Sequence, residues 1–300
     1  MLIPTLTKSM NGNMKEKINT WIISVIMLMI SMLMIAPFIF MVLGSLKTMG
    51  EIQSPTFSLL PEAFRWINYA EAMQRGNWLT YIKNSVIVTV VATVISLIIN
   101  SLCGYAFARL EFKGRDTLFS LALLGLLVPP QVTIAPVFVM MSKIPLAGGN
   151  NIFGQGGIGW INSYWGLIVP YLAGSFGVFL CRQFYISFPK SLDEAAKIDG
   201  CSKWRTYFMI YLPLSKSILA TLAILKASFC WNEYTWPLII TNSEKMRTVQ
   251  LALAVFKSEN TVEWNLLLAA STTISIPMIL MFLMGQKYYV EGIVTSGIKG

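Results

Sequence analysis

Six long windows of this 300-residue chain are almost free of charge, and they limit its fold more than any other feature. A helix needs about 20 predominantly apolar residues to cross roughly 30 Å of hydrocarbon, where lipid offers no partners to exposed backbone groups. The predicted spans are about 18–46, 84–108, 117–142, 164–187, 213–240 and 264–286. The predicted fold class is an all-α polytopic membrane protein with six transmembrane helices in a single domain, 1–300.

The distribution of Lys and Arg predicts the orientation of these spans. With the N-terminus inside, 14 of the 23 basic residues lie in inner segments and eight in outer ones. Cytoplasmic loops carry the excess of Lys and Arg, so both termini and the loop 188–213 are predicted to be cytoplasmic. The formal charge of +9 is scattered between apolar runs and does not form the basic patch of a nucleic-acid-binding protein.

Several kinds of chemistry lack the residues that they require. The chain has no histidine, and its four cysteines have no CxxC spacing, so we expect neither a metal site nor a disulfide framework. It also has no GxxxxGK[ST] motif, and therefore no loop that could cradle nucleotide phosphates. We expect no cofactor to be bound by this chain.

The predicted cytoplasmic loop contains the most specific pattern. The run from Ser191 to Glu194 fits a capping box, which predicts that a helix begins there. Gly200 suits a left-handed turn at the end of that helix, and Trp204, Tyr207 and Phe208 give a second helix an apolar face. Pro213 suits the first turn of the fifth span, where it needs no amide partner. A compact docking element is predicted.

The same pattern resembles the EAA loop of binding-protein-dependent ABC importer permeases. Three residues separate Ala196 from Gly200, and nine more precede Ile210. Further segments resemble the carbohydrate-type branch of this family, and particularly the second permease subunit of maltose-type transporters. They are Tyr105–Arg109 with Phe112 and Gly114, Pro129 with Gln131 and Val132, Tyr164–Ile168, Arg182–Phe184, Trp231–Tyr234, Trp236–Leu238, Arg247 with Thr248, and Tyr289–Gly300.

The resemblance implies an assembly in a bacterial cell membrane. Its members would be this multi-pass chain, a homologous second permease, two ATPase subunits that use ATP and Mg, and an extracytoplasmic solute-binding protein that delivers a sugar or oligosaccharide. This chain would not itself be an enzyme. The residues implied in coupling to the ATPase are Glu194, Ala195, Ala196, Asp199, Gly200, Ile210, Leu212 and Pro213. For Glu194, an interaction with the ATPase and a role only in helix capping are both open.

Polar residues of the fifth span are candidates for the substrate path. Ionisable groups within hydrocarbon are costly, which makes Lys226 and Glu233 functional candidates together with Trp231 and Asn232. Aromatic faces suit sugar rings, although aromatic residues also anchor helices at membrane interfaces. Lys226 is explained either by an acidic sugar or by a carboxylate of a partner subunit.

Two predicted outer segments are candidates for contact with the binding protein. In maltose-type systems, the loop that corresponds to 241–263 reaches into that protein, and the resemblance carries this role to Asn242, Ser243, Glu244 and Lys245. The glycine-rich segment 147–161 is compatible either with such a contact or with a disordered linker.

Other functions remain as alternatives. A self-contained secondary transporter or channel, or an intramembrane enzyme, would leave the EAA pattern without a role. An ABC permease for a solute other than a sugar would retain that role.

Overall fold

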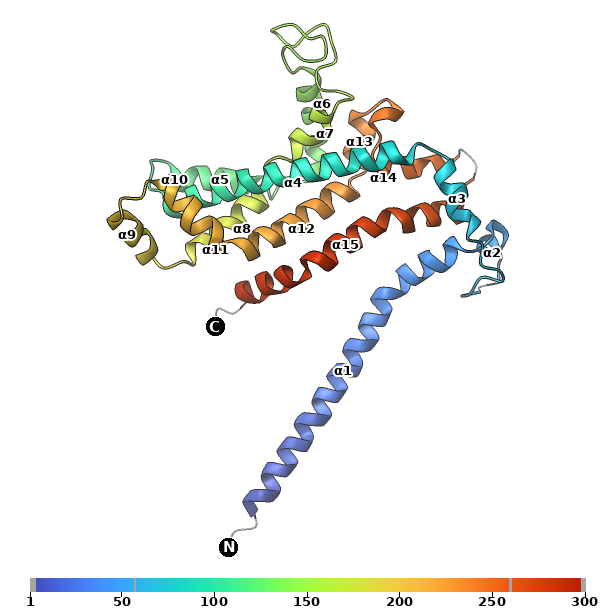
Figure 1. Ribbon diagram of the computed structural model, residues 1–300, viewed down its shortest axis with the longest axis horizontal. Coiled ribbons are helices and arrows are strands. Elements are labelled where there is room, and N and C mark those ends of the chain that lie inside the picture. The colour runs from blue at the N-terminus through green and yellow to red at the C-terminus, as the bar shows by residue number, and fades with distance from the viewer. Residues whose placement is uncertain (1–3, 57, 259–260, 298–300) are drawn as a thin grey trace. The chain divides into compact units, whose positions relative to one another are not determined.

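The protein is mostly helical in the part of the chain that the structure describes (Figure 1). The computed structural model describes residues 4–56, 58–258 and 261–297, with side chains between 19 and 287 in these ranges. These ranges contain an isolated bridge between Lys257 and Val262 but no strand. The chain divides into two compact units, Met1–Gln74 with Phe256–Thr273, and Arg75–Val255 with Ile274–Gly300. The all-α class predicted from the sequence is confirmed.

The first unit contains the first predicted span. It consists of α1 (Pro4–Ser45), α2 (Met49–Gln53), α3 (Ile67–Gln74) and the beginning of α15 (Trp264–Gly297). The apolar part of α1, Asn19–Ser45, buries none of its most hydrophobic window inside the chain, as expected of a helix surrounded by lipid or by other membrane helices. The buried Asn68 amide donates to the carbonyls of Ser45 and Lys47, each at 2.8 Å, and so fixes the end of α1.

The second unit contains the remaining elements and the rest of α15. The central helix is α4 (Trp78–Arg109). The others are α5 (Arg115–Leu124), α6 (Pro130–Ser142), α7 (Tyr164–Ile168), η1 (Val169–Tyr171), α8 (Ser175–Ile186), α9 (Ser191–Ile198), α10 (Lys203–Thr206), η2 (Tyr207–Tyr211), α11 (Leu212–Leu214), α12 (Lys216–Asn232), α13 (Thr235–Ile240), η3 (Glu244–Met246), α14 (Val249–Ala252) and η4 (Leu253–Phe256), the last ending in the first unit.

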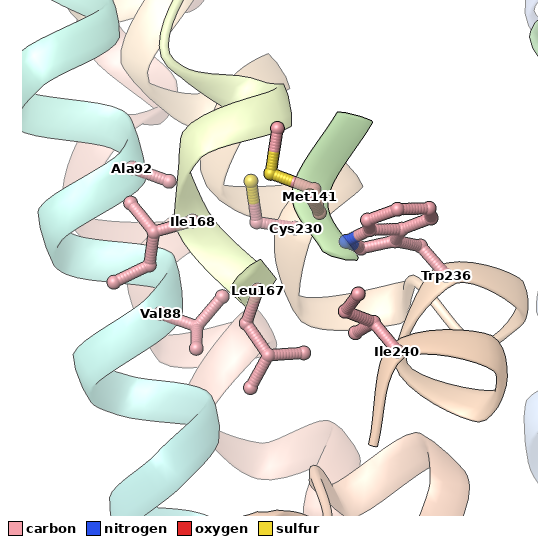
Figure 2. Close-up of a cluster of buried hydrophobic side chains, with 8 residues drawn as sticks. All are labelled: Val88, Ala92, Met141, Leu167, Ile168, Cys230, Trp236 and Ile240. Atoms are coloured by element: carbon pink, nitrogen blue, oxygen red, sulfur yellow. The ribbon is translucent and has the colours of Figure 1, made fainter. Parts of the chain in front are cut away.

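A buried hydrophobic cluster joins five helices of the second unit (Figure 2). Val88 and Ala92 of α4 face Leu167 and Ile168 of α7. The other members come from α6, α12 and α13 and are Met141, Cys230, Trp236 and Ile240. These elements are far apart in the sequence, so the cluster holds the start of α4 against three interrupted segments.

Among the described residues, three helices are long and apolar enough to cross a membrane by themselves. They are Asn19–Ser45, Trp78–Arg109 and Trp264–Lys287, and they contain the predicted spans 18–46, 84–108 and 264–286 almost completely. Two bent pairs could each form one further span: Tyr164–Tyr171 with Ser175–Ile186, bent by 42°, and Lys203–Leu214 with Lys216–Asn232, bent by 76°. The structure thus has between three and five candidate spans, whereas the sequence predicted six.

Prolines explain why three predicted helices are interrupted. The predicted helix over 117–142 is divided into α5 and α6, since Pro129 is extended (φ −59°, ψ 132°) in front of Pro130. In the fourth span, Pro170 has no amide to donate to the Gly166 carbonyl, which instead accepts a hydrogen bond from the Trp236 indole at 2.9 Å. In the fifth span, Pro237 cannot donate to the carbonyl of Glu233, and the helix ends at Asn232.

Candidate functional site

The predicted cytoplasmic loop folds as two short helices joined by a sharp turn. Gly200 has φ +68°, in the left-handed region that favours glycine. The Gly200 amide donates to the Lys197 carbonyl at 3.1 Å and the Cys201 amide to the Ala196 carbonyl at 2.8 Å. These two hydrogen bonds form a Schellman motif, which satisfies carbonyls at the end of α9. The predicted helix, its end and the conformation of Gly200 are confirmed.

The capping box predicted from Ser191 and Glu194 is wrong. The N-cap of α9 is Lys190, which has helical dihedrals (φ −64°, ψ −24°) and makes no side-chain capping bond. The Asp193 and Glu194 amides both donate to the Lys190 carbonyl, so Lys190 and not Ser191 occupies the N-cap position. An N-cap side chain requires an extended backbone, and Ser191 lies inside the first turn instead.

The predicted coupling residues divide into an exposed group and a packed group. Glu194, Ala195, Asp199, Gly200 and Pro213 are exposed, whereas Ala196 is buried and Ile210 and Leu212 are half-buried. Exposed apolar side chains extend the first group. They are Ile198, at 86% exposure, and Trp204 and Phe208, whose rings stack with centroids 6.3 Å apart. Tyr207 is buried, so the predicted apolar face of the second helix is divided between surface and interior.

Pro213 does not begin the fifth span as predicted. It lies in α11, and α12 begins at Lys216 after the 76° bend. The segment before it, Tyr207–Tyr211, is a π-helix. Pro213 has no amide for the carbonyl of Met209, which disfavours ordinary helical bonding through this segment. The result is a separate docking element in front of α12.

Ile210 and Leu212 of the packed group lie against a cluster of buried tyrosines that sequence reasoning missed. Its buried members are Tyr105 of α4, Cys181 and Tyr185 of α8, Tyr207 and Tyr211 of η2, and Leu222 of α12. The sequence did contain a signal: Ser101, Tyr105 and Arg109 of α4 are spaced four residues apart. This spacing places them on one face of the helix.

The polar residues predicted for the substrate path lie around the end of α12. Lys226 is half-buried, with Nζ 5.6 Å from the ring centroid of Tyr171 and 5.7 Å from that of Phe229. The exposed Asn232 accepts a hydrogen bond from Gln250 at 3.0 Å. Sequence reasoning missed both aromatic rings around Lys226. Tyr171 comes from the interrupted fourth span, and Phe229 lies three residues after Lys226 in α12.

Glu233 and Trp231 make specific contacts within the chain. The Glu233 carboxylate accepts a hydrogen bond from the Trp236 amide at 3.0 Å and so stabilises the start of α13. Trp231 is buried, and its indole donates to the Ile274 carbonyl of α15 at 3.1 Å. Trp231 therefore packs between helices, whereas Lys226, Asn232 and Glu233 remain at least partly accessible.

The two predicted outer segments meet at Asn162. Its side-chain oxygen accepts hydrogen bonds from the amides of Asn242 and Ser243 and from the Ser243 hydroxyl, at 2.9–3.2 Å. Its own amide donates to the Ile240 carbonyl at 2.8 Å. Asn162, directly after the glycine-rich segment, therefore holds the loop that follows α13.

Residues near the start of α4 also hold the loop that follows α13. Asn84 donates to the carbonyls of Lys245 and Arg247, each at 2.8 Å, and Tyr81 donates to the Glu244 carboxylate at 2.6 Å. The side chains of Asn242, Glu244 and Lys245 remain exposed. The four predicted contact residues thus lie together on a supported loop.

The glycine-rich segment is folded by its own hydrogen bonds. The buried Asn150 donates to the carbonyls of Ser142 and Ile144 and accepts from the Gly157 amide at 2.8 Å. Five glycines with positive φ close its turns: 148, 149, 154, 156 and 159. Leu146, Ile152 and Phe153 are strongly exposed at its surface.

Comparisons with known proteins identify the family of this chain. Residues 100–291 match the family described as "Binding-protein-dependent transport system inner membrane component". The chain is 31% identical to the arabinooligosaccharides transport system permease protein AraQ of Halalkalibacterium halodurans, over 96% of this chain and 100% of that protein. It is also 31% identical to the trehalose/maltose transport system permease protein MalG of Thermococcus litoralis, with the same shares covered.

A solved structure shares the fold. It is a chain of a bacterial ABC transporter involved in the import of the acidic polysaccharide alginate, with a TM-score of 0.76 and 21% identity, and the match covers 92% of this chain and 98% of that one. Its likeness supports the fold alone. The chain belongs to the family of binding-protein-dependent transport system inner membrane components.

Proposed function

We propose that this chain is a membrane-spanning permease subunit of an ATP-driven importer for a sugar or oligosaccharide in a bacterial cell membrane. The observation that carries the proposal is the exposed α9–Gly200–α10 element in a chain of this family. Relatives that align over nearly the whole chain are named for arabino-oligosaccharides and for trehalose and maltose, which supports the substrate class.

The proposed assembly contains a homologous second permease, two ATPase subunits and an extracytoplasmic solute-binding protein. The exposed surface of Glu194, Ala195, Asp199, Gly200 and Ile198 would dock on an ATPase, which would bind and hydrolyse ATP with Mg. The surface joined by Asn162, with Asn242, Ser243, Glu244 and Lys245, would face the binding protein. Its exposed position at the start of α4, away from α9, supports this assignment (Figure 1).

We also propose six crossings with both termini cytoplasmic. Three are the uninterrupted helices, and a fourth is the bent pair of Tyr164–Tyr171 and Ser175–Ile186. The fifth predicted span would begin to cross at α12, behind the docking element. The third predicted crossing would be made by α5 and α6 together, with a break between Gly125 and Pro129. The excess of Lys and Arg in the predicted inner segments supports the orientation.

Reconstitution tests the function. The chain would be placed in proteoliposomes with its second permease and ATPase and supplied with the purified binding protein and labelled arabinotriose, maltose, trehalose or alginate pentasaccharide. Uptake of a probe should require both ATP and the binding protein. Uptake by this chain alone without ATP would contradict the proposal and indicate a secondary transporter or channel.

Lys226 and Glu233 give a prediction about the path by which the substrate crosses the membrane. An ammonium group near the hydrocarbon centre costs about 2.5–3.5 kcal/mol even on the insertion scale, so Lys226 is expected to face water, a partner carboxylate or the substrate. If Lys226 and Glu233 border the path, Lys226→Met and Glu233→Gln should each reduce uptake about tenfold, a change of about 1.4 kcal/mol, with normal amounts of assembled complex.

The control for this prediction is Lys216→Met, which removes an exposed ammonium at the start of α12. A larger loss for alginate pentasaccharide than for neutral probes would assign Lys226 to an acidic sugar. Loss of assembled complex with Lys226→Met would indicate a structural ion pair with a partner subunit. Unchanged uptake of every probe by both path variants would remove these residues from the path.

A further inference from the structure

One face of α4 holds the docking element at three successive positions. Ser101 shares hydrogen bonds with the hydroxyls of Tyr185 and Tyr207, at 2.6 and 2.8 Å. One turn further, the Tyr105 hydroxyl donates to the Lys203 carbonyl at 3.2 Å. These contacts attach α8, α10 and η2 to the same face of α4, and the third position is Arg109.

The Arg109 guanidinium joins three segments at once. It donates to the carbonyl of Tyr185, in the last turn of α8, at 3.1 Å and to that of Phe188, two residues after the end of α8. It also forms an ion pair with Asp193 of α9, with 3.2 Å between Nη1 and Oδ2. The Arg109 side chain is 7% exposed, and carbonyls at a helix end need donors, so this cation is held firmly against α8.

Asp193 is held from two sides. Oδ2 pairs with Arg109, and Oδ1 accepts a hydrogen bond from the Tyr211 hydroxyl at 2.8 Å. The Arg109 guanidinium also lies over the Tyr211 ring, 5.4 Å from its centroid. Each carboxylate oxygen therefore has its own donor, and the three side chains connect α4, α9 and η2.

Neighbouring carboxylates of α9 have different surroundings. Glu194 is exposed and is available to a partner, whereas Asp193 is half-buried against α4. A force applied to the exposed side of α9 must either move Arg109 with it or break a partly buried ion pair. Breaking such a pair leaves a charge without its partner in a site that water reaches poorly.

We propose that Asp193 and Arg109 are positioning residues that transmit movement of α9 to α4 and α8, with Tyr211 orienting the Asp193 carboxylate. This inference rests on the proposed function, because it requires an ATPase that moves α9. It assigns distinct roles to adjacent residues: Glu194 contacts the partner, and Asp193 passes the displacement to the membrane helices.

The test compares transport with ATP hydrolysis in the reconstituted complex. Asp193→Asn should reduce uptake per ATP hydrolysed by about tenfold, because hydrogen bonds to charged groups are the strong ones. Complex assembly and basal ATP hydrolysis should persist, since the exposed surface of α9 is unchanged. Uptake is measured with the labelled probe that the wild-type complex transports.

Milder variants separate positioning from folding. Tyr211→Phe keeps the ring below Arg109 but removes one hydrogen bond, and should give a smaller loss of uptake per ATP. Asp193→Glu keeps the carboxylate and should restore part of the coupling. The matched control is Arg115→Gln, which removes an exposed ion pair with the adjacent Asp116, at 3.1 Å, and should leave the ratio unchanged.

Two results would overturn the inference. One is normal uptake per ATP with Asp193→Asn; the other is loss of assembled complex in proportion to uptake in both Asp193→Asn and Tyr211→Phe, which would show a purely structural role. Failure of the wild-type complex to take up any probe would instead contradict the proposed function. Because the wild-type complex is measured first, failure of the proposed function can be told apart from failure of this inference.

Discussion

Replacement of Gly104 by leucine is expected to abolish assembly of the permease, because α4 and α8 approach each other too closely for a side chain at this position. A Cβ added to Gly104 would lie 2.9 Å from the backbone nitrogen of Arg182 and would also collide with Cys181. Small residues let membrane helices pack backbone to backbone, so the helices would have to separate. Overpacking typically costs about 1–3 kcal/mol and occasionally more, and a clash with backbone atoms places Gly104→Leu at about 3 kcal/mol.

The measurement is the amount of monodisperse protein after extraction in mild detergent, determined by size-exclusion chromatography. For a change of this size, we expect the ratio of folded to unfolded protein to fall about a hundredfold. Gly174→Ala is the matched control, since a Cβ there meets nothing within 4 Å and the glycine is extended, with φ −161°. Normal recovery of Gly104→Leu would show that the α4–α8 contact is not as close as described.

Gly200→Val is expected to abolish ATP-driven uptake while leaving membrane insertion and folding intact. Nothing lies within 4 Å of an added Cβ at this position, so the effect would come from the backbone alone. A residue with a Cβ loses roughly 1–2 kcal/mol in the left-handed conformation, and a β-branched side chain loses more. The turn between α9 and α10 should therefore open and displace the docking surface.

Gly200→Asn is the corresponding control, because asparagine enters the left-handed region more readily than other residues. Uptake and co-purification of the ATPase should be lost with valine and largely kept with asparagine, at equal amounts of permease in the membrane. Full uptake with Gly200→Val would refute the coupling role of this turn.

Much of the docking element could be predicted because its signals are local. Gly200 supplies a left-handed turn at the end of a helix, and the spacing around it specifies two short helices. The helix begins at Ser191 as predicted, but the capping box of Ser191 and Glu194 does not form. A serine caps a helix only where it occupies the N-cap position with an extended backbone, and here Lys190 occupies that position while Ser191 lies in the first turn.

The interruptions of the predicted spans show the same limit. Pro129, Pro170 and Pro237 indicate where a helix loses an amide donor. They do not indicate how the freed carbonyl is satisfied. At Gly166 the partner is the Trp236 indole, 70 residues away, and a hydropathy window carries no information about such a contact.

The sequence by itself determined the apolar helices, the absence of a nucleotide-binding motif, and the turn at Gly200, because each depends on residues close together in the chain. Only the tertiary structure decided that Asp193 meets Arg109 and Tyr211, and that Asn84 and Asn162 support one outer loop. These partners lie up to 163 residues apart. Their contacts depend on how α4 packs against the other helices, and only the folded chain fixes that packing.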